Sequence, residues 1–537
     1  MAEVDQFPRL GAVPRSANEV SFAVWAPAAG AVSVGLEGGD RPLERRGDGL
    51  FAAVLPGAAG DDYVYVLDGE RRLADPCSRW QPLGVDGPSR VQDPASLRLR
   101  EAAFEPPALD ELVLYEVHVG TFTSEGTFDA AIEHLPDLRD LGVSAIELMP
   151  VATFPGERNW GYDGVYAYAP HPVYGGPAGL ARLVDAAHGC GLAVVLDVVY
   201  NHVGPGIDLR AFAPYFTDRY STPWGEALDF ARRGVREWAL QNAEMWVRDY
   251  HVDGLRLDAT HAVFDDSEPH VLAELAQRVH AIAPRAFVVA EMEAGDVRPI
   301  EEWGHDAQWS DEFHHTLHVL TTGERDGYYA AYRASVADLA TQLEREPAER
   351  LVVCSQNHDQ VGNRAFGDRP APDELRLRAA ALLFAPQLPL LFMGEEYGEQ
   401  RPFRFFTDHR DPAIAQATRE GRRREFERFA AFGGAEIPDP QDPRTFEESK
   451  LDRNVSNEEL RRFYRELIAL RPGLAGRLEV EADEPARFLR LRRGDYELCL
   501  NFADQAQRGV GPRDARLAVV ELRGSGKGEP DAKSRRT

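Results

Sequence analysis

Three acidic residues follow short apolar segments that read as buried strands. Asp258 and Glu291 each come directly after such a segment, and Asp359 lies shortly beyond a third one. One carboxylate can attack an anomeric carbon, a protonated one can donate to the leaving oxygen, and a third can stabilise an oxocarbenium-like transition state. A single acidic residue at a strand end is usually a cap or an ion-pair partner, but three on successive or near-successive strands predict a retaining glycoside-cleaving site.

The surroundings of two of these acids fit that chemistry. Arg256 precedes Asp258 by two residues, so the two side chains share one face of a strand. The arginine would keep the attacking carboxylate ionised. Glu291 has to stay protonated at neutral pH, which burial and neighbouring carboxylates favour.

A (β/α)8 barrel would bring these residues together. Eight short apolar segments alternate with amphipathic stretches: Leu112–His118, Ala145–Met149, Ala193–Val199, Gly254–Leu257, Phe287–Ala290, Asp306–Trp309, Leu351–Cys354 and Leu390–Phe392. Continuous apolar character is typical of parallel strands buried on both faces. Reactive residues in such a barrel lie at the carboxyl ends of the strands.

Two all-β regions are expected to flank the barrel. Short alternating runs such as Val20–Trp25 and Tyr63–Leu67 indicate an N-terminal β-sandwich, and Leu478–Phe502 indicates a small C-terminal β domain. We therefore expect a sandwich over residues 1–104, the barrel over 105–472, the C-terminal domain over 473–523, and a polar, disordered tail over 524–537.

Charge and cysteine usage restrict the partners and the compartment. The formal charge of −28 disfavours nucleic acid and anionic membranes and suits a neutral substrate. The four cysteines lie far apart, without a CxxC pair, which is consistent with a reducing compartment. The N-terminus lacks the features of a signal peptide, so we expect a cytoplasmic protein.

Four motifs carry a family resemblance. Asp197-Val-Val-Tyr-Asn-His202, Gly254-Leu-Arg-Leu-Asp258, the strand-end Glu291, and Asn357-His-Asp359 resemble the four conserved regions of the α-amylase superfamily, glycoside hydrolase family 13. The resemblance implies that Asp258 is the nucleophile, Glu291 the acid/base and Asp359 the transition-state stabiliser.

The same resemblance implies a set of sugar contacts. Tyr162 would stack on the sugar at the cleavage point, and His261 would face the sugar on the leaving side. Three further residues would contact the first sugar or the nucleophile: His202, Arg256 and His358. Among the tryptophans, Trp160 is the best candidate for a stacking platform, with core packing as the alternative.

Longer stretches narrow the resemblance. The segments Asp306–His315, Thr322–Tyr329 and Gln356–Arg364 are similar to those of malto-oligosyltrehalose trehalohydrolases. Members of that family release trehalose from maltooligosyl trehalose made by a partner synthase. The three carboxylates serve equally well in a glucan branching enzyme, a transferase, and in other α-1,4-glucan hydrolases of the superfamily, so these alternatives stay open.

No metal or cofactor is expected. Asp311, His314, His315 and His318 have a spacing that could hold a metal, but polar residues lining a cleft or capping a helix explain it better. Asn201 binds calcium in some superfamily members, yet the sequence supplies no other visible oxygen ligands.

Overall fold

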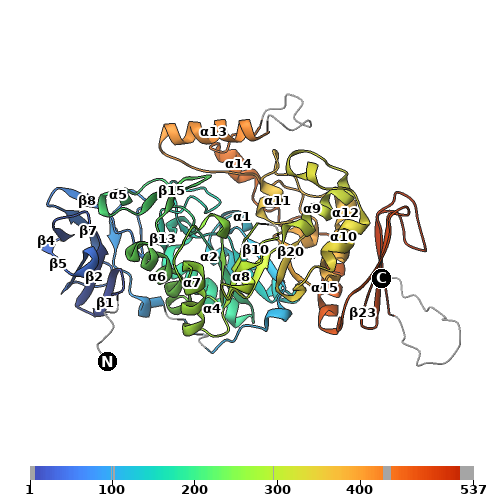
Figure 1. Ribbon diagram of the computed structural model, residues 1–537, viewed down its shortest axis with the longest axis horizontal. Coiled ribbons are helices and arrows are strands. Elements are labelled where there is room, and N and C mark those ends of the chain that lie inside the picture. The colour runs from blue at the N-terminus through green and yellow to red at the C-terminus, as the bar shows by residue number, and fades with distance from the viewer. Residues whose placement is uncertain (1–6, 98, 101–102, 294, 427–436, 520–537) are drawn as a thin grey trace.

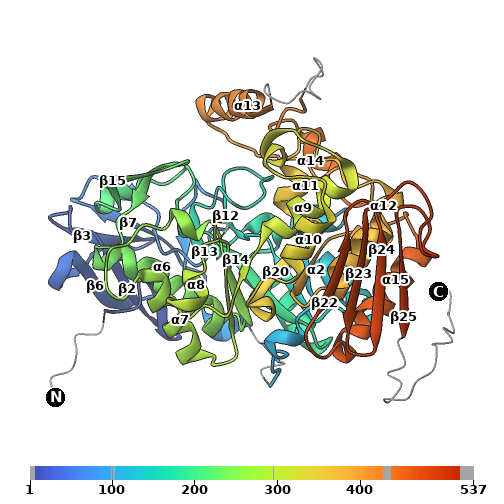
Figure 2. The same ribbon diagram turned by 45° about the vertical axis from the view of Figure 1, so that its right-hand side comes forward.

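The molecule has a central barrel with a β-sheet region at each end. The computed structural model describes residues 7–97, 99–100, 103–293, 295–426 and 437–519. The N-terminal sheets and the C-terminal sheet lie on opposite sides of the barrel (Figures 1 and 2). The predicted order of the three regions is confirmed. Their exact boundaries stay a prediction, and the predicted tail at 524–537 lies outside the described residues.

Eight parallel strands close into the barrel, as the sequence predicts. The ring closes because β21 pairs with β10, with Leu390 opposite Leu114. In chain order the strands are β10 (Leu114–Val117), β11 (Ala145–Leu148), β14 (Ala193–Val198), β17 (Gly254–Leu257), β18 (Phe287–Ala290), β19 (Ala307–Trp309), β20 (Leu351–Cys354) and β21 (Leu388–Phe392).

The barrel interior has an apolar floor and a polar layer above it. Leu114, Ala145 and Val195 belong to one buried cluster within the barrel. Two residues further along the same three strands, on the same faces, come Glu116, Glu147 and Asp197. These three acids are all buried. The strand alternation thus changes from apolar to acidic at the end of the barrel where the predicted reactive residues lie.

Helices, most of them amphipathic, cover the outside of the barrel. The main ones are α4 (Gly176–Gly189), α6 (Arg233–Asp249), α7 (Val271–Ile282), α9 (Asp311–Thr322), α12 (Pro372–Phe384) and α15 (Glu458–Leu470). The stretch Phe128–Leu141, predicted as one amphipathic segment, forms two helices, α2 (Phe128–Ile132) and α3 (Leu135–Leu141). Pro136 lies in the first turn of α3, where a missing N–H is tolerated, and marks the restart.

The N-terminal region consists of two antiparallel sheets. One has the order β1-β2-β6-β5 and the other the order β4-β3-β7-β8, with β9 on β7. Its first strands are β1 (Gly11–Ser16), β2 (Glu19–Trp25) and β3 (Val32–Leu36). They are followed by β4 (Gly39–Pro42), β5 (Glu44–Arg45), β6 (Leu50–Pro56), β7 (Asp62–Leu67), β8 (Arg71–Leu73) and β9 (Ser89–Arg90). An edge-on contact between Trp25 and Tyr215, 5.5 Å between ring centroids, connects this region to the barrel.

The C-terminal region is a four-stranded antiparallel sheet. It contains β22 (Glu479–Asp483), β23 (Phe488–Arg493), β24 (Tyr496–Asn501) and β25 (Asp514–Val519). Arg487 and Arg513 from this region donate hydrogen bonds to the carbonyls of Leu320 and Thr321, at 2.8 and 2.6 Å. The sheet therefore satisfies carbonyl groups at the carboxyl end of α9 that have no partner within the helix.

Two further observations bear on the sequence expectations. All four cysteines are free thiols. A search of the described residues finds no helix with the length and apolar character needed to cross a membrane.

Candidate active site

A buried arginine lies at the centre of the polar layer. Arg256 is fully buried, and its Nη1 lies 2.8 Å from Asp197 Oδ2 and 2.9 Å from Asp258 Oδ1. Its Nη2 lies 3.0 Å from Glu291 Oε2. Burial alone would lower the pKa of Arg256, but Asp197, Glu291 and Asp258 together raise it well above its ordinary value. One permanently charged guanidinium thus holds three carboxylates around the barrel mouth.

Asp258 is fixed at the end of β17 by two side chains. Arg256 binds its Oδ1, and the Asn201 amide donates to its Oδ2 at 2.7 Å and to its carbonyl at 2.9 Å. The carboxylate is buried, with 8% of the residue exposed. These donors hold the carboxylate in one orientation at the end of the strand.

Glu291 follows β18, and N–H groups of two other residues approach one oxygen of its carboxyl group, Oε2. The Ala259 backbone N–H donates to Oε2 at 2.7 Å, and Arg256 Nη2 lies beside the same atom. Ala259 reaches this position with φ of +41°, a conformation that non-glycine residues seldom adopt. Oε1 has no hydrogen-bond partner within the described chain.

Asp359 is the most accessible of the three predicted catalytic acids. Its side chain is 30% exposed, and Asn363 donates to its Oδ1 at 2.9 Å. It is the second residue of α11 (His358–Gly362), a short helix that begins shortly after β20. The carboxylate is therefore held from one side and open to the barrel mouth on the other.

His358 is clamped between acidic groups. Glu116 accepts hydrogen bonds from its ring and from its backbone N–H, the latter at 2.8 Å, while Asp359 Oδ2 lies 3.5 Å from its Nε2. Burial alone would lower the pKa of His358, but Asp359 and Glu116 raise it to about 10. The imidazole is therefore cationic at neutral pH and contributes positive charge at the mouth.

Tyr162 lies across the same mouth. Its hydroxyl donates to Asp197 Oδ2 at 2.5 Å and lies 2.8 Å from His358 Nε2, and the two rings are stacked. Burial, more than any other effect, raises the pKa of Asp197 to about 7, although Arg256 opposes the shift. Asp197 thus contacts both Tyr162 and Arg256, and Arg256 in turn contacts the predicted nucleophile.

The remaining predicted sugar-binding residues differ in how exposed they are. His202 is buried, touches Asn201 and is stacked at 4.6 Å on Trp224, which is 49% exposed. His261 is exposed in the short helical turn after the nucleophile. Trp160 is only 3% exposed, lies flat on Phe403 and donates from Nε1 to the Arg404 carbonyl at 2.9 Å. Its position corresponds to core packing beneath His358, not to an open stacking platform.

The histidines of α9 do not gather around a metal position. No group of three or more potential ligands is found in the described part of the chain. The His314 ring donates to the Ser355 carbonyl at 2.8 Å, and His318 lies 2.8 Å from Glu324. Asn201 uses its amide on Asp258 and its carbonyl oxygen on His202. These contacts favour the helix-lining interpretation.

Several residues of the site were not among the predicted site residues. Asp197 and Asn201 were part of a quoted motif without an assigned role, and the alternation along β10 could have indicated Glu116. Trp309 packs under Arg256, with 4.2 Å between the guanidinium carbon and the ring centroid. Trp224 and Asp311 come from the connections after β14 and β19. Only the three-dimensional structure shows that they lie near the other site residues.

Comparisons with known proteins agree with this geometry. The family model for the alpha amylase catalytic domain matches residues 118–224. The family model for carbohydrate-binding module 48 (isoamylase N-terminal domain) matches residues 9–78. The malto-oligosyltrehalose trehalohydrolase of Deinococcus radiodurans is 43% identical over 87% of this chain and 83% of its own length. The chain belongs to the malto-oligosyltrehalose trehalohydrolase family.

Two further comparisons, one with a solved structure and one with a branching enzyme, support the same family. A crystal structure from Salmonella typhimurium, provisionally titled an alpha amylase, superposes with a TM-score of 0.87, 36% identity, and coverage of 95% of this chain and 99% of that one. A 1,4-alpha-glucan branching enzyme of Thiobacillus denitrificans is only 30% identical, over 74% of this chain and 62% of its own length. The chain is a glycosidase of the α-amylase superfamily, and the trehalohydrolases resemble it more closely than that branching enzyme does.

Proposed function

We propose that this chain hydrolyses the α-1,4-glucosidic bond next to the terminal trehalose of maltooligosyl trehalose and releases trehalose. The observation that carries the proposal is the convergence of Asp258 and Glu291 on one buried arginine, at 2.9 and 3.0 Å, in a member of the trehalohydrolase family. Retaining glycosidases need a nucleophile and an acid about 5 Å apart. Two carboxylates bound to one guanidinium are compatible with that spacing.

The first half-reaction forms a glycosyl-enzyme. An Asp258 oxygen attacks the anomeric carbon while the bond from that carbon to the trehalose oxygen breaks. Glu291 gives its proton to the departing oxygen, and trehalose leaves as a neutral alcohol. Asp359, open to the mouth and held by Asn363, stabilises the positive charge that develops on the sugar ring.

The second half-reaction restores the enzyme. Glu291, now ionised, takes a proton from water as the water attacks the anomeric carbon. The bond to Asp258 breaks, and the maltooligosaccharide leaves with its α configuration retained. Arg256 keeps Asp258 anionic as a leaving group because it contacts that carboxylate in the buried layer. Neither half-reaction needs a metal or a cofactor.

Side chains around the mouth would hold the sugar at the cleavage point. We assign this role to Tyr162, His202, Arg256 and His358, and the leaving side to His261. Tyr162 and His358 stack with 5.1 Å between ring centroids, which suits a rigid surface beside a sugar ring. Trp160 would act indirectly, since its edge supports His358 at 5.7 Å.

The biological setting follows from the substrate. We propose that the protein works in the cytoplasm after a maltooligosyl trehalose synthase, which converts the reducing end of a maltooligosaccharide into a trehalose unit. The free, widely separated thiols support a reducing compartment.

Product analysis tests the proposal against its main alternative. The purified protein is incubated with maltooligosyl trehalose and, separately, with maltooligosaccharide and amylose, and the products are separated by chromatography. Free trehalose from the first substrate with little action on the others is expected. Branched or longer products from amylose, without trehalose, would instead identify a branching transferase.

A further inference from the structure

Asp311 lies in the barrel mouth beside the proposed acid/base. It begins α9 and comes two residues after Trp309, whose ring packs under Arg256 inside the barrel. In the ring of strands, β19 stands between β18, which ends before Glu291, and β20, which precedes Asp359. Asp311 therefore follows the carboxyl end of β19, the end of the barrel at which the reactive residues of such folds lie.

The Asp311 residue is partly exposed, and its carboxylate has no hydrogen-bond or ion-pair partner among the described residues. Within the described ranges, no N–H or O–H group donates to it and no cation pairs with it. The other acids of the mouth differ. Asp258 and Glu291 contact Arg256, and Asp359 accepts from Asn363. A carboxylate has several acceptor positions, so Asp311 offers unused acceptors inside the cleft.

The charges around Asp311 place it on the acid side of the site. Burial, followed by the negative charges of Glu291 and Asp359, raises the pKa of Asp311 to about 7, although Arg256 opposes the shift. In the barrel, β19 pairs with β18, which precedes Glu291, and not with β17, which precedes Asp258. Glu291 protonates the oxygen of the departing unit, so a residue beside Glu291 and away from the nucleophile lies close to the leaving group.

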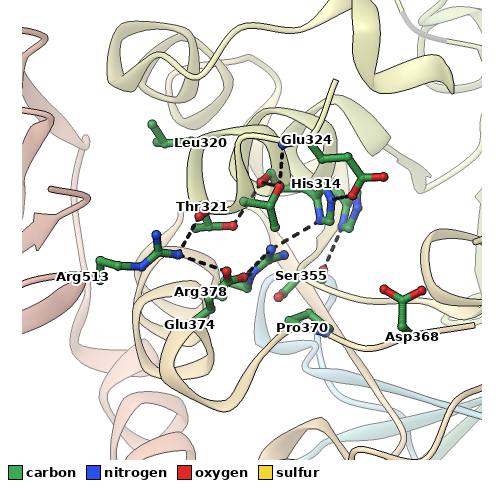
Figure 3. Close-up of polar contacts among 12 residues, drawn as sticks. His314, Leu320, Thr321, Glu324, Ser355, Asp368, Pro370, Glu374, Arg378 and Arg513 are labelled. Carbon is green, nitrogen blue, oxygen red and sulfur yellow. Dashed lines mark hydrogen bonds and ion pairs between the residues drawn. The ribbon is translucent and has the colours of Figure 1, made fainter. Parts of the chain in front are cut away.

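The helix that carries Asp311 is fixed at several points. The His314 ring donates to the Ser355 carbonyl at 2.8 Å, and Arg513 joins Thr321 to Glu374 with contacts of 2.6 and 3.0 Å (Figure 3). Glu374 is also bound by the buried Arg378 at 2.9 Å. Preorganised acceptors lose less entropy when they bind a ligand than mobile ones do.

We propose that Asp311 accepts hydrogen bonds from hydroxyl groups of the departing trehalose unit and thereby helps to select it. The inference rests on the proposed function. A buried site that pairs with substrate hydroxyls discriminates strongly, because a ligand without matching groups leaves the polar side chain unsatisfied. A maltooligosaccharide with a simple aromatic leaving group has no trehalose for Asp311 to hold.

The experiment compares two substrates in three variants. Asp311→Ala removes the acceptor, Asp311→Asn keeps the shape and one acceptor oxygen, and Glu312→Gln is the matched control. Glu312 is the next residue on α9 and pairs with Arg345 at 3.0 Å. The readouts are kcat and KM on maltooligosyl trehalose and on a 4-nitrophenyl α-maltooligoside, inhibition by free trehalose, and thermal unfolding.

We expect the Asp311 variants to lose activity on maltooligosyl trehalose but not on the aryl substrate. Asp311→Ala should lower kcat/KM on maltooligosyl trehalose at least about tenfold and weaken trehalose inhibition, with a smaller loss in Asp311→Asn. The aryl substrate and the control should change less than about twofold. Equal losses on both substrates, or no loss on either, would overturn the inference. If the unmodified protein releases no trehalose at all, the proposed function itself fails.

Discussion

Arg256 Nη1 lies 2.9 Å from Asp258 Oδ1, and one residue separates the two in the chain. The pair is positioned by strand geometry, since residues two apart point to the same side. The same guanidinium reaches Glu291 on the neighbouring strand and Asp197 on the preceding one. A single cation thus links the proposed nucleophile and the proposed acid.

Replacement of the nucleophile should abolish turnover without unfolding the protein. Asp258→Asn keeps the size of the side chain and its contact with Asn201 but cannot form the glycosyl-enzyme. We expect kcat to fall on the order of 10⁴-fold, with the circular dichroism spectrum unchanged. Appreciable residual activity in a carefully purified sample would place the nucleophile elsewhere.

The acid role of Glu291 predicts a dependence on the leaving group. Glu291→Gln cannot donate a proton, so hydrolysis of maltooligosyl trehalose should fall by about 10²–10⁴-fold. A fluoride or dinitrophenyl α-maltooligoside departs without protonation, so its glycosylation step should fall much less. Initial rates of the variant are measured on both substrates. An equal loss of activity on the two would contradict the acid role of Glu291.

His358 should make the stability pH-dependent above neutrality. Its folded pKa of about 10 exceeds the value of about 6.5 in an unfolded chain. Its protonation therefore stabilises the fold fully below pH 6.5, and that contribution disappears as the pH rises through 10.

Urea unfolding of the unmodified protein and of His358→Gln checks this sign. Between pH 7 and 10, the free energy of unfolding of the unmodified protein should decrease more steeply, by up to about 1.4 kcal/mol per pH unit. Parallel curves for the two proteins would show that His358 is not held protonated by Glu116 and Asp359.

Replacing Trp160 should lower the stability of the protein, whereas replacing Trp224 should weaken substrate binding. Trp160→Phe loses a buried hydrogen bond and some packing, so the free energy of unfolding should fall by about 1–3 kcal/mol, with KM almost unchanged. Trp224→Ala removes an exposed ring stacked on His202, so KM should rise about tenfold, equivalent to about 1.4 kcal/mol, with little loss of stability. Denaturation curves and steady-state kinetics separate the two, and the reverse pattern would refute both assignments.

The barrel could be predicted from the sequence because its strands are short, apolar and separated by amphipathic helices. The predicted bounds of Gly254–Leu257, Phe287–Ala290 and Leu351–Cys354 match the observed strands. Asp258, Glu291 and Asp359 follow these strands, so the barrel topology alone brings them to one mouth.

Other features depended on contacts between distant segments. Nothing local in the sequence shows that Trp160 lies against Phe403, or that Arg513 reaches the end of α9. The backbone turn at Ala259, with its N–H directed at Glu291, likewise requires two strands in register. In the sequence, Asp311 is one member of a helical spacing pattern. The structure distinguishes it, because its carboxylate has no partner among the described residues.

Proton NMR of a reaction in progress tests the central claim most directly. The purified protein is mixed with maltooligosyl trehalose, and the anomeric signals are followed before mutarotation equilibrates them. We expect trehalose to appear together with a shorter maltooligosaccharide whose new reducing end is initially the α anomer. An initial β anomer would contradict the retaining mechanism through Asp258, and maltooligosaccharides without trehalose would contradict the proposed substrate.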